Sequence, residues 1–307
     1  MVYNIEDERS LAMSEYVITC CSTVDLSKAT LDERGIPYAM FHYRIGSEEF
    51  LDDLYSSITP EKFYQDITDG AEPVTSQVNA DEYIALWKPF LDEGKDILHI
   101  TLSSGISGTF NSANVARDMI KEDYPKRQVV VVDSLAASAG YGMLVMAARD
   151  NQDKGMSIGE NAAWVVDNRN KLHHWFFSTD LTSYIRGGRV SKASGLVGTM
   201  LKICPLLNVN CEGKLIARNK CRGKKKAIAE AFAQMQNFAQ NGRGYRGTCY
   251  MSHSMMQEDA KALADMIEAY FTNMDGKVHI SQIGTVIGSH TGPGTVALFF
   301  WGNERTE

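Results

Sequence analysis

The sequence lacks the features that would place the protein in a membrane or on nucleic acid. Its 307 residues include no apolar run as long as the roughly 18 residues that a membrane-spanning helix needs. The N-terminal MVYNIEDERS does not have the pattern of a signal peptide. A formal net charge of −7 gives no electrostatic basis for binding DNA, RNA or anionic lipid. We therefore expect a cytoplasmic protein with no nucleic-acid partner and no stable membrane insertion.

Cysteine is scarce, and its placement argues against metal or disulfide chemistry. The chain has 6 cysteines and no CxxC pair, and the adjacent Cys20 and Cys21 cannot easily bind one metal ion together. Free, mostly buried thiols are the expected state. The chain also lacks the P-loop pattern GxxxxGK[ST], so it should not bind ATP by that route. We expect no metal site and no cofactor.

The first half of the chain alternates strand-like and helix-like segments. YVITC, DILHITLSS and RQVVVVDS indicate strands, and TPEKFYQDI, NADEYIALWKPFLDEG and ISGTFNSANVARDMI indicate helices. This rhythm predicts an open, largely parallel sheet. The pattern changes after a helix near residues 158–170, and further strands with two long helices predict a mixed sheet. We expect an α/β protein of two domains, residues 1–165 and 166–307.

Hydroxyl side chains are concentrated in two short segments. The segment SSGISGT carries Ser103, Ser104, Ser107 and Thr109 between a predicted strand and a predicted helix. Open α/β sheets bind ligands at the carboxyl ends of their strands, and free N–H groups at a helix N-terminus favour an anion. A well-capped turn is the alternative, although four hydroxyls exceed what capping requires. The segment TSQ at 75–77 also lies before a predicted helix, where N-capping alone would explain it.

Three further segments carry basic or imidazole side chains. GSHTGPGTVALFF places His290 on a predicted glycine-rich loop before a strand, where the ring faces solvent or approaches a ligand. YIRGGRVS places Arg186 and Arg189 on either side of two glycines, and a guanidinium fork suits a carboxylate or phosphate. A solvated loop is an equally good interpretation of YIRGGRVS. NKCRGKKKAIAE predicts a solvated helix start, with a charged docking surface as the alternative.

Taken in their order along the chain, these segments resemble the DegV family of bacterial fatty-acid-binding proteins. The resemblance runs from about Val17 to Phe300. It rests on CSTVDL at 21–26, TSQ at 75–77, SSGISGT at 103–109, VVDS at 131–134, GGR at 187–189, Arg222 before a basic helix, and H-x-GPG at 290–294. Cys21 departs from the pattern because the family usually has aspartate there, which leaves the role of the first turn open.

The resemblance implies a lipid carrier with one long-chain fatty acid buried in a tunnel between the two domains. The fatty-acid carboxylate would meet Thr75, Ser107 and His290, with three further hydroxyls as supports. These supports are Ser76, Ser104 and Thr109. A buried carboxylate is very costly without hydrogen-bond partners, which these groups would supply.

The resemblance also implies a partner protein. Such proteins present the fatty acid to a separate ATP-dependent fatty acid kinase, which converts the carboxylate to an acyl phosphate. Arg189 and Arg222 match family arginines linked to that transfer or to docking. On this hypothesis the chain has no chemistry of its own.

Two other functions remain open on the residues alone. The first is an enzyme acting on acyl or phosphoryl groups, with Ser107 or Thr75 as nucleophile and His290 as base. An acid that orients the imidazole would support it, and the sequence does not identify one. The second is a binding protein for another apolar carboxylate, such as a lipid signal.

Overall fold

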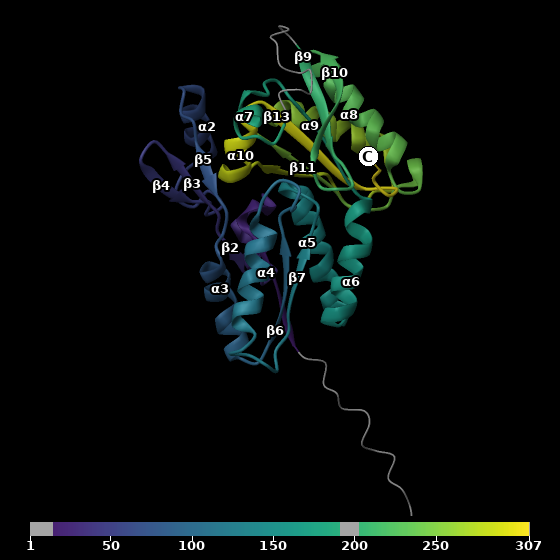
Figure 1. Ribbon diagram of the computed structural model, residues 1–307. Coiled ribbons are helices and arrows are strands. Elements are labelled where there is room, and N and C mark those ends of the chain that lie inside the picture. Colours follow the sequence, from purple (N-terminus) through teal and green to yellow (C-terminus); the bar gives the residue numbers. More distant parts are fainter. Residues whose placement is uncertain (1–14, 191–202, 307) are drawn as a thin grey trace, which may run out of the picture.

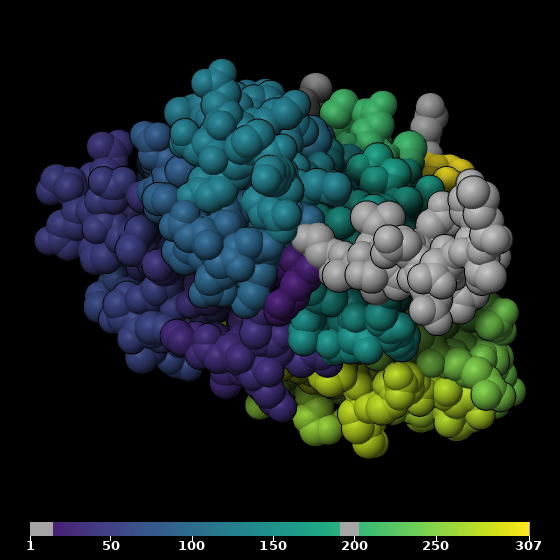
Figure 2. Space-filling model, turned by 90° about the horizontal axis from the view of Figure 1, so that it is seen from below, coloured from purple at the N-terminus to yellow at the C-terminus, as the bar shows by residue number. Residues whose placement is uncertain are grey.

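The computed structural model describes residues 15–190 and 203–306. The expectation about the N-terminal MVYNIEDERS therefore lies outside the described residues. The described chain forms two α/β halves, one in the lower and one in the upper part of Figure 1. Seen from below, the purple and blue atoms of the early residues occupy the left of the view, and green and yellow atoms of the late residues lie at the lower right, where they adjoin the purple ones (Figure 2). The structure thus has the expected α/β class with two separate sheets.

The first half is built on a parallel sheet of four strands in the order β2-β1-β6-β7. Every pairing in it is parallel, which confirms the predicted open sheet. The strands are β1 (Tyr16–Cys21), β2 (Tyr38–Ala39), β6 (Asp96–Thr101) and β7 (Val129–Asp133). From β1 the chain continues outward to β2, and from β6 it continues outward to β7 on the opposite side, so the strand order reverses between β1 and β6. The crevice beyond the carboxyl ends of these two strands is the expected ligand position.

Helices cover both faces of this sheet. α3 and α4 contact β6 on one face, while α5 contacts β1 and α6 contacts β6 and β7 on the other (Figure 1). The helices are α1 (Lys28–Glu33), α3 (Ala80–Asp92), α4 (Thr109–Ile120), α5 (Ser138–Asp153) and α6 (Ile158–Asn168). Short 3₁₀ turns occupy Ser22–Val24 and Arg169–Lys171. Asn79 with Glu82 forms a capping box at α3, and Ser157 with Glu160 forms one at α6.

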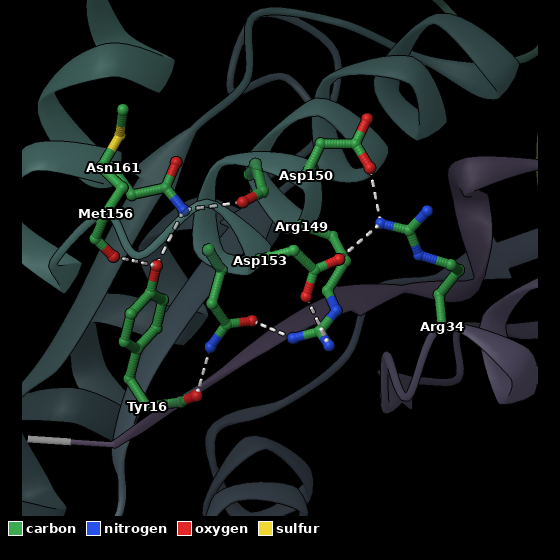
Figure 3. Close-up of polar contacts among 9 residues, drawn as sticks. Tyr16, Arg34, Arg149, Asp150, Asp153, Met156 and Asn161 are labelled. Atoms are coloured by element: carbon green, nitrogen blue, oxygen red, sulfur yellow. Dashed lines mark hydrogen bonds and ion pairs between the residues drawn. The ribbon is translucent and has the colours of Figure 1, made fainter.

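Polar contacts hold α5 and α6 to β1 and α1 (Figure 3). The Tyr16 hydroxyl donates to the Met156 carbonyl at 2.9 Å and accepts from Asn161 Nδ2 at 3.0 Å. Arg34, just after α1, pairs with Asp150 at 2.5 Å and with Asp153 at 3.1 Å on the last turn of α5. These contacts hold the C-terminal end of α5 to the first half. The N-terminal end of α5 reaches the second half.

A small antiparallel sheet, in the order β4-β3-β5, lies above the parallel sheet at the upper left of Figure 1, where β3 and β5 contact the later helix α10 (Thr285–Thr291). It contains β3 (His42–Ile45), β4 (Glu48–Leu51) and β5 (Val74–Ser76), with α2 (Pro60–Thr68) between β4 and β5 in the chain. Gly46 lies in the tight turn between β3 and β4 with φ of 61°, a left-handed conformation that glycine adopts readily. Thr75 and Ser76 belong to strand β5, and Asn79 caps α3, so N-capping does not explain the TSQ segment. The strand has only three residues and depends on its pairing with β3.

The second half is built on a mixed sheet of six strands in the order β10-β9-β8-β13-β11-β12. Among the described strands of this sheet, only β11 and β12 pair in parallel. The strands are β8 (Leu172–Ser178), β9 (Ile203–Val209), β10 (Leu215–Arg222), β11 (Cys249–His253), β12 (His279–Gln282) and β13 (Thr295–Trp301). The helices are α7 (Thr182–Arg186), α8 (Lys224–Phe238), α9 (Gln257–Tyr270) and α10 (Thr285–Thr291), with a 3₁₀ turn at Gly242–Gly244. The mixed sheet confirms the expectation for this half.

Helix α5 lies between the two sheets. It contacts β1 of the parallel sheet and β8, β11 and β13 of the mixed sheet, while α8 and α9 cover the other face of the mixed sheet. The strands of the parallel sheet end at Asp133 and those of the mixed sheet begin at Leu172. The predicted boundary at residues 165 and 166 falls within α6, and this division into domains stays a prediction.

Gly140 marks the closest approach of α5 to the mixed sheet. A Cβ on Gly140 would lie 2.5 Å from both His174 Nε2 and Phe299 Cδ1. Gly140→Ala should therefore lower the free energy of unfolding by about 1–3 kcal/mol, because two packed rings must shift. Urea unfolding measures this effect. Gly159→Ala in α6 is the control, since a Cβ there meets nothing within 4 Å. Equal stability of the two variants would contradict the proposed close packing.

Candidate ligand-binding site

A cavity of about 180 Å³ lies where the two halves meet. This is about 12 to 18 times the roughly 10–15 Å³ that one buried water needs. Leu102 and Ala137 border it just beyond the carboxyl ends of β6 and β7. Phe176 of β8 and Phe299 of β13 border it from the mixed sheet. The cavity thus occupies the position that parallel α/β sheets use for ligands.

Most of the cavity wall is apolar. The apolar lining residues come from loops, strands and α10 and include Phe41, Ile106, Val209, Leu215, Val286 and Ile287. An apolar wall with a few polar groups is typical of a binding site for a ligand with a long apolar part. The cavity can therefore shield hydrocarbon from water along most of its wall.

Polar side chains from four separate segments lie in the wall of the same cavity. Thr75 of β5, Ser107 before α4, Arg189 after α7 and His290 of α10 all line it. Thr75 Oγ1 lies 2.8 Å from His290 Nε2. Hydroxyl and guanidinium groups in an apolar enclosure suit the oxygen atoms of an anion. Thr75, Ser107 and His290, which the sequence predicted to meet, thus border one cavity.

His290 lies in the last turn of α10, so the predicted glycine-rich loop was wrong at this position. Gly284 is the N-cap of the helix, which ends at Gly292 with φ of 66°. Burial and, to a lesser extent, the nearby guanidinium groups of Arg189 and Arg186 together lower the pKa of His290 to about 4. The imidazole is therefore neutral near pH 7.

The N-terminus of α10 is held by two buried carboxyl groups of the first half. Asp25 Oδ1 accepts from the Gly284 N–H at 2.9 Å, and Asp52 Oδ1 accepts from the Thr285 hydroxyl at 2.8 Å. The Ser138 hydroxyl donates to Asp25 Oδ2 and lies 2.8 Å from Ser252 Oγ of β11. Burial raises the pKa of both carboxyl groups. These contacts fix the position of α10 and therefore the position of His290 in its last turn.

Arg189 lies at the polar part of the cavity. Its Nε donates to the Ile106 carbonyl at 3.2 Å, and its Nη1 donates to the Gly187 carbonyl at 2.6 Å. Burial lowers the pKa of its guanidinium. The sequence analysis predicted Arg189 for phosphoryl transfer or docking, not as a lining residue beside Thr75, Ser107 and His290, and the structure places it in the same cavity wall. Gln77 was also not predicted as a ligand contact, although it belongs to the TSQ segment and lines the cavity.

Four predicted residues lie outside the cavity lining. Ser76 and Ser104 are exposed, and Arg222 is exposed at the end of β10. Thr109 is buried, and its hydroxyl lies 2.5 Å from the Tyr83 hydroxyl. The roles predicted for these four residues stay predictions.

Cys21 is buried beneath the first turn and does not line the cavity. Its Sγ lies 3.3 Å from the Tyr83 hydroxyl and 3.8 Å from His99 Nε2. Burial raises the pKa of the Cys21 thiol to about 11, so the thiolate is disfavoured near pH 7. All six cysteines are free. Cys21 is therefore a packed, hydrogen-bonded thiol.

Two features are absent from the described part of the chain. Within residues 15–190 and 203–306, no three His, Cys, Asp or Glu side chains come close enough together to hold a metal ion. None of the helices in those residues has both the length and the apolar character to cross a bilayer.

Comparison with known proteins gives consistent matches over nearly the whole chain. A family model described as "Uncharacterised protein, DegV family" matches residues 16–303. A DegV domain-containing protein of Clostridium perfringens is 37% identical over 293 residues, which cover 95% of this chain and 99% of the relative.

Solved structures give the same match. A DegV family protein from Thermus thermophilus, described for its fatty acid binding, superposes with a TM-score of 0.83 at 28% identity. The match covers 94% of this chain and 99% of that chain. The Streptococcus pneumoniae fatty acid kinase B3 protein, loaded with linoleic acid, shares the fold with a TM-score of 0.81 at 20% identity, over 94% and 100% of the two chains. With the family model spanning both sheets, the chain belongs to the DegV family.

Proposed function

We propose that this chain is a carrier that binds one long-chain fatty acid in the cavity between its halves. The observation that carries the proposal is the mostly apolar cavity with Thr75, Ser107, Arg189 and His290 in its wall. The hydrocarbon chain would lie along the apolar wall, and the carboxylate would face these four side chains. The fatty acid binding described for the Thermus thermophilus relative supports this assignment.

The electrostatics of the polar groups favour an anionic ligand. A carboxylate removed from water must regain hydrogen bonds and opposing charge. Arg189 supplies the positive charge, because a guanidinium stays protonated even when partly buried. The neutral His290 supplies no net charge at pH 7. A carboxylate thus complements the site better than a cation or an uncharged alcohol does.

We further propose that the bound carboxylate is presented to a separate ATP-dependent fatty acid kinase. This part rests on the family resemblance, in which Arg189 and Arg222 match arginines linked to transfer or docking. The absence of a P-loop pattern from the sequence agrees with a kinase on another chain. Arg222 is exposed, as a docking residue must be.

The enzyme hypothesis has one geometric point in its favour, the 2.8 Å contact between Thr75 Oγ1 and His290 Nε2. A nucleophile and base pair needs a third group that orients the base. His290 Nδ1 is buried and makes no hydrogen bond with any residue in the described part of the chain. The imidazole therefore lacks the orienting acid that this chemistry uses, and the carrier function is favoured.

Mass spectrometry of the organic extract of purified protein tests the proposal. We expect about one fatty acid per chain, and saturable rebinding to the delipidated protein at the same stoichiometry. An uncharged fatty alcohol of equal length is the matched ligand control and should bind more weakly. A delipidated, folded sample that binds no long-chain fatty acid would overturn the proposed function.

A further inference from the structure

The two ring nitrogens of His290 have unequal surroundings. Nε2 lies 2.8 Å from Thr75 Oγ1, within hydrogen-bond distance. Nδ1 is shielded from solvent and has no hydrogen-bond partner in the described residues. A neutral imidazole carries one N–H, which must be on one of these two atoms.

Gly187 covers the unpartnered nitrogen. A Cβ built on Gly187 would lie 2.2 Å from His290 Nδ1. The backbone does not require glycine here, because φ is −71° and ψ is −6°, values that any residue adopts. Space is therefore what favours glycine at this position, since its Cα–H face lies against the imidazole ring.

These surroundings decide the position of the ring proton. A proton on Nδ1 would leave a buried donor facing a Cα–H, at a cost of about 1–3 kcal/mol. A proton on Nε2 has the Thr75 hydroxyl as acceptor. Protonation of both nitrogens is disfavoured by burial and by the neighbouring Arg189 and Arg186. The tautomer with the proton on Nε2 is the one that leaves no donor unpaired.

We propose that His290 donates from Nε2 to Thr75 Oγ1 and thereby directs the Thr75 hydroxyl proton into the cavity. Thr75 is then the group that donates to the ligand carboxylate. His290 is a positioning residue that acts through Thr75, and Gly187 is a positioning residue that holds the ring in this tautomer. The role toward the carboxylate rests on the proposed fatty-acid function, whereas the tautomer does not.

The tautomer is tested on delipidated protein labelled with ¹⁵N-histidine. Long-range ¹H–¹⁵N spectra near pH 7, with the His290 signals assigned by their loss in His290→Gln, distinguish the two ring nitrogens. We expect a protonated Nε2 and an unprotonated Nδ1. A proton on Nδ1, or an imidazolium, would overturn the proposal. This measurement needs no ligand, so it stands even if fatty-acid binding is not found.

The relay is tested by a double-variant cycle on fatty-acid affinity. We expect Thr75→Val and His290→Leu each to weaken binding, Thr75→Val by about tenfold for one lost hydrogen bond to a charged group. The double variant should bind no worse than Thr75→Val, because His290 acts through the Thr75 hydroxyl. Thr75→Ser, which keeps the hydroxyl, should bind nearly as well as the wild type. Additive losses would show a direct contact from His290 and overturn the positioning role.

Gly187→Ala tests the covering residue. Its Cβ should displace the imidazole and weaken binding toward the His290→Leu value, with the His290 ¹⁵N signals shifted in the same sample. Gly159→Ala in α6, with no neighbour within 4 Å of its Cβ, is the matched control and should leave both unchanged. Unaltered His290 signals in Gly187→Ala would overturn the role of Gly187. If the wild type binds no fatty acid, the proposed function fails, and the spectra still decide the tautomer.

Discussion

Arg189→Ala should weaken fatty-acid binding by about 10- to 100-fold, because a hydrogen bond to a charged group in a partly buried site is lost. Arg189 lines the cavity with Thr75, Ser107 and His290 and brings positive charge to this group. Arg189→Lys keeps the charge without the planar fork and should lose less. Titration of delipidated protein with a fluorescent or radiolabelled fatty acid measures the affinities, and circular dichroism checks the fold.

Arg222→Ala is the matched control, because Arg222 is exposed at the end of β10 and does not line the cavity. It should bind fatty acid as the wild type does while lowering acyl-phosphate formation by a cognate kinase. This separates the two arginines that the sequence had grouped together. Equal fatty-acid affinities of Arg189→Ala and Arg222→Ala would contradict the placement of Arg189 at the carboxylate.

Asp25→Asn should gain stability relative to the wild type as the pH rises. Burial raises the pKa of the Asp25 carboxyl well above its ordinary value of 3.8. Between that value and the higher value of the folded state, the folded protein holds a proton that the unfolded chain has released. The wild type therefore loses stability as the pH rises through this interval, by about 1.4 kcal/mol for each unit by which the pKa is raised.

The asparagine keeps the hydrogen bonds without the titration. Its Oδ1 can accept from the Gly284 N–H, and its Nδ2 can donate to Ser138 Oγ. Buried imidazoles such as His99 give the wild type a pH dependence of opposite sign, because burial lowers their pKa. The difference in unfolding free energy between variant and wild type, measured in urea from about pH 4 to pH 8, isolates Asp25. A difference independent of pH would contradict the raised pKa.

The elements that the sequence predicted well carry their determinants locally. Thr59 and Pro60 start α2, and Asn79 with Glu82 starts α3, each within a few residues of the helix they begin. Helix α10 has no such signal, because its seven residues include a glycine and its N-terminus is held by Asp25 and Asp52 from the other half. Contacts with residues far away in the sequence determine where α10 forms, and its local sequence pattern does not indicate these contacts.

The same contrast between local and distant determinants explains which residues of the candidate site could be predicted from the sequence. Thr75, Ser107 and His290 were predicted to meet, on the strength of the family resemblance, and they border one cavity. Thr75 and Ser76 are neighbours on strand β5, where successive side chains point to opposite faces, so only Thr75 lines the cavity. Thr109 is the first residue of α4, and its buried hydroxyl contacts Tyr83 instead. The position of Arg189 depends on how the chain returns after α7, which the sequence pattern does not show.

The position of β13 within the mixed sheet has a consequence for synthesis on the ribosome. The strands of the parallel sheet all lie between Tyr16 and Asp133, so that sheet can pair while later residues are still being added. β13 lies between β8 and β11, and it pairs with both. Until Thr295–Trp301 has left the exit tunnel, β8 and β11 each lack this neighbour, and the cavity lacks Phe299. The cavity wall is therefore completed only after the first half has been synthesised and has had time to fold.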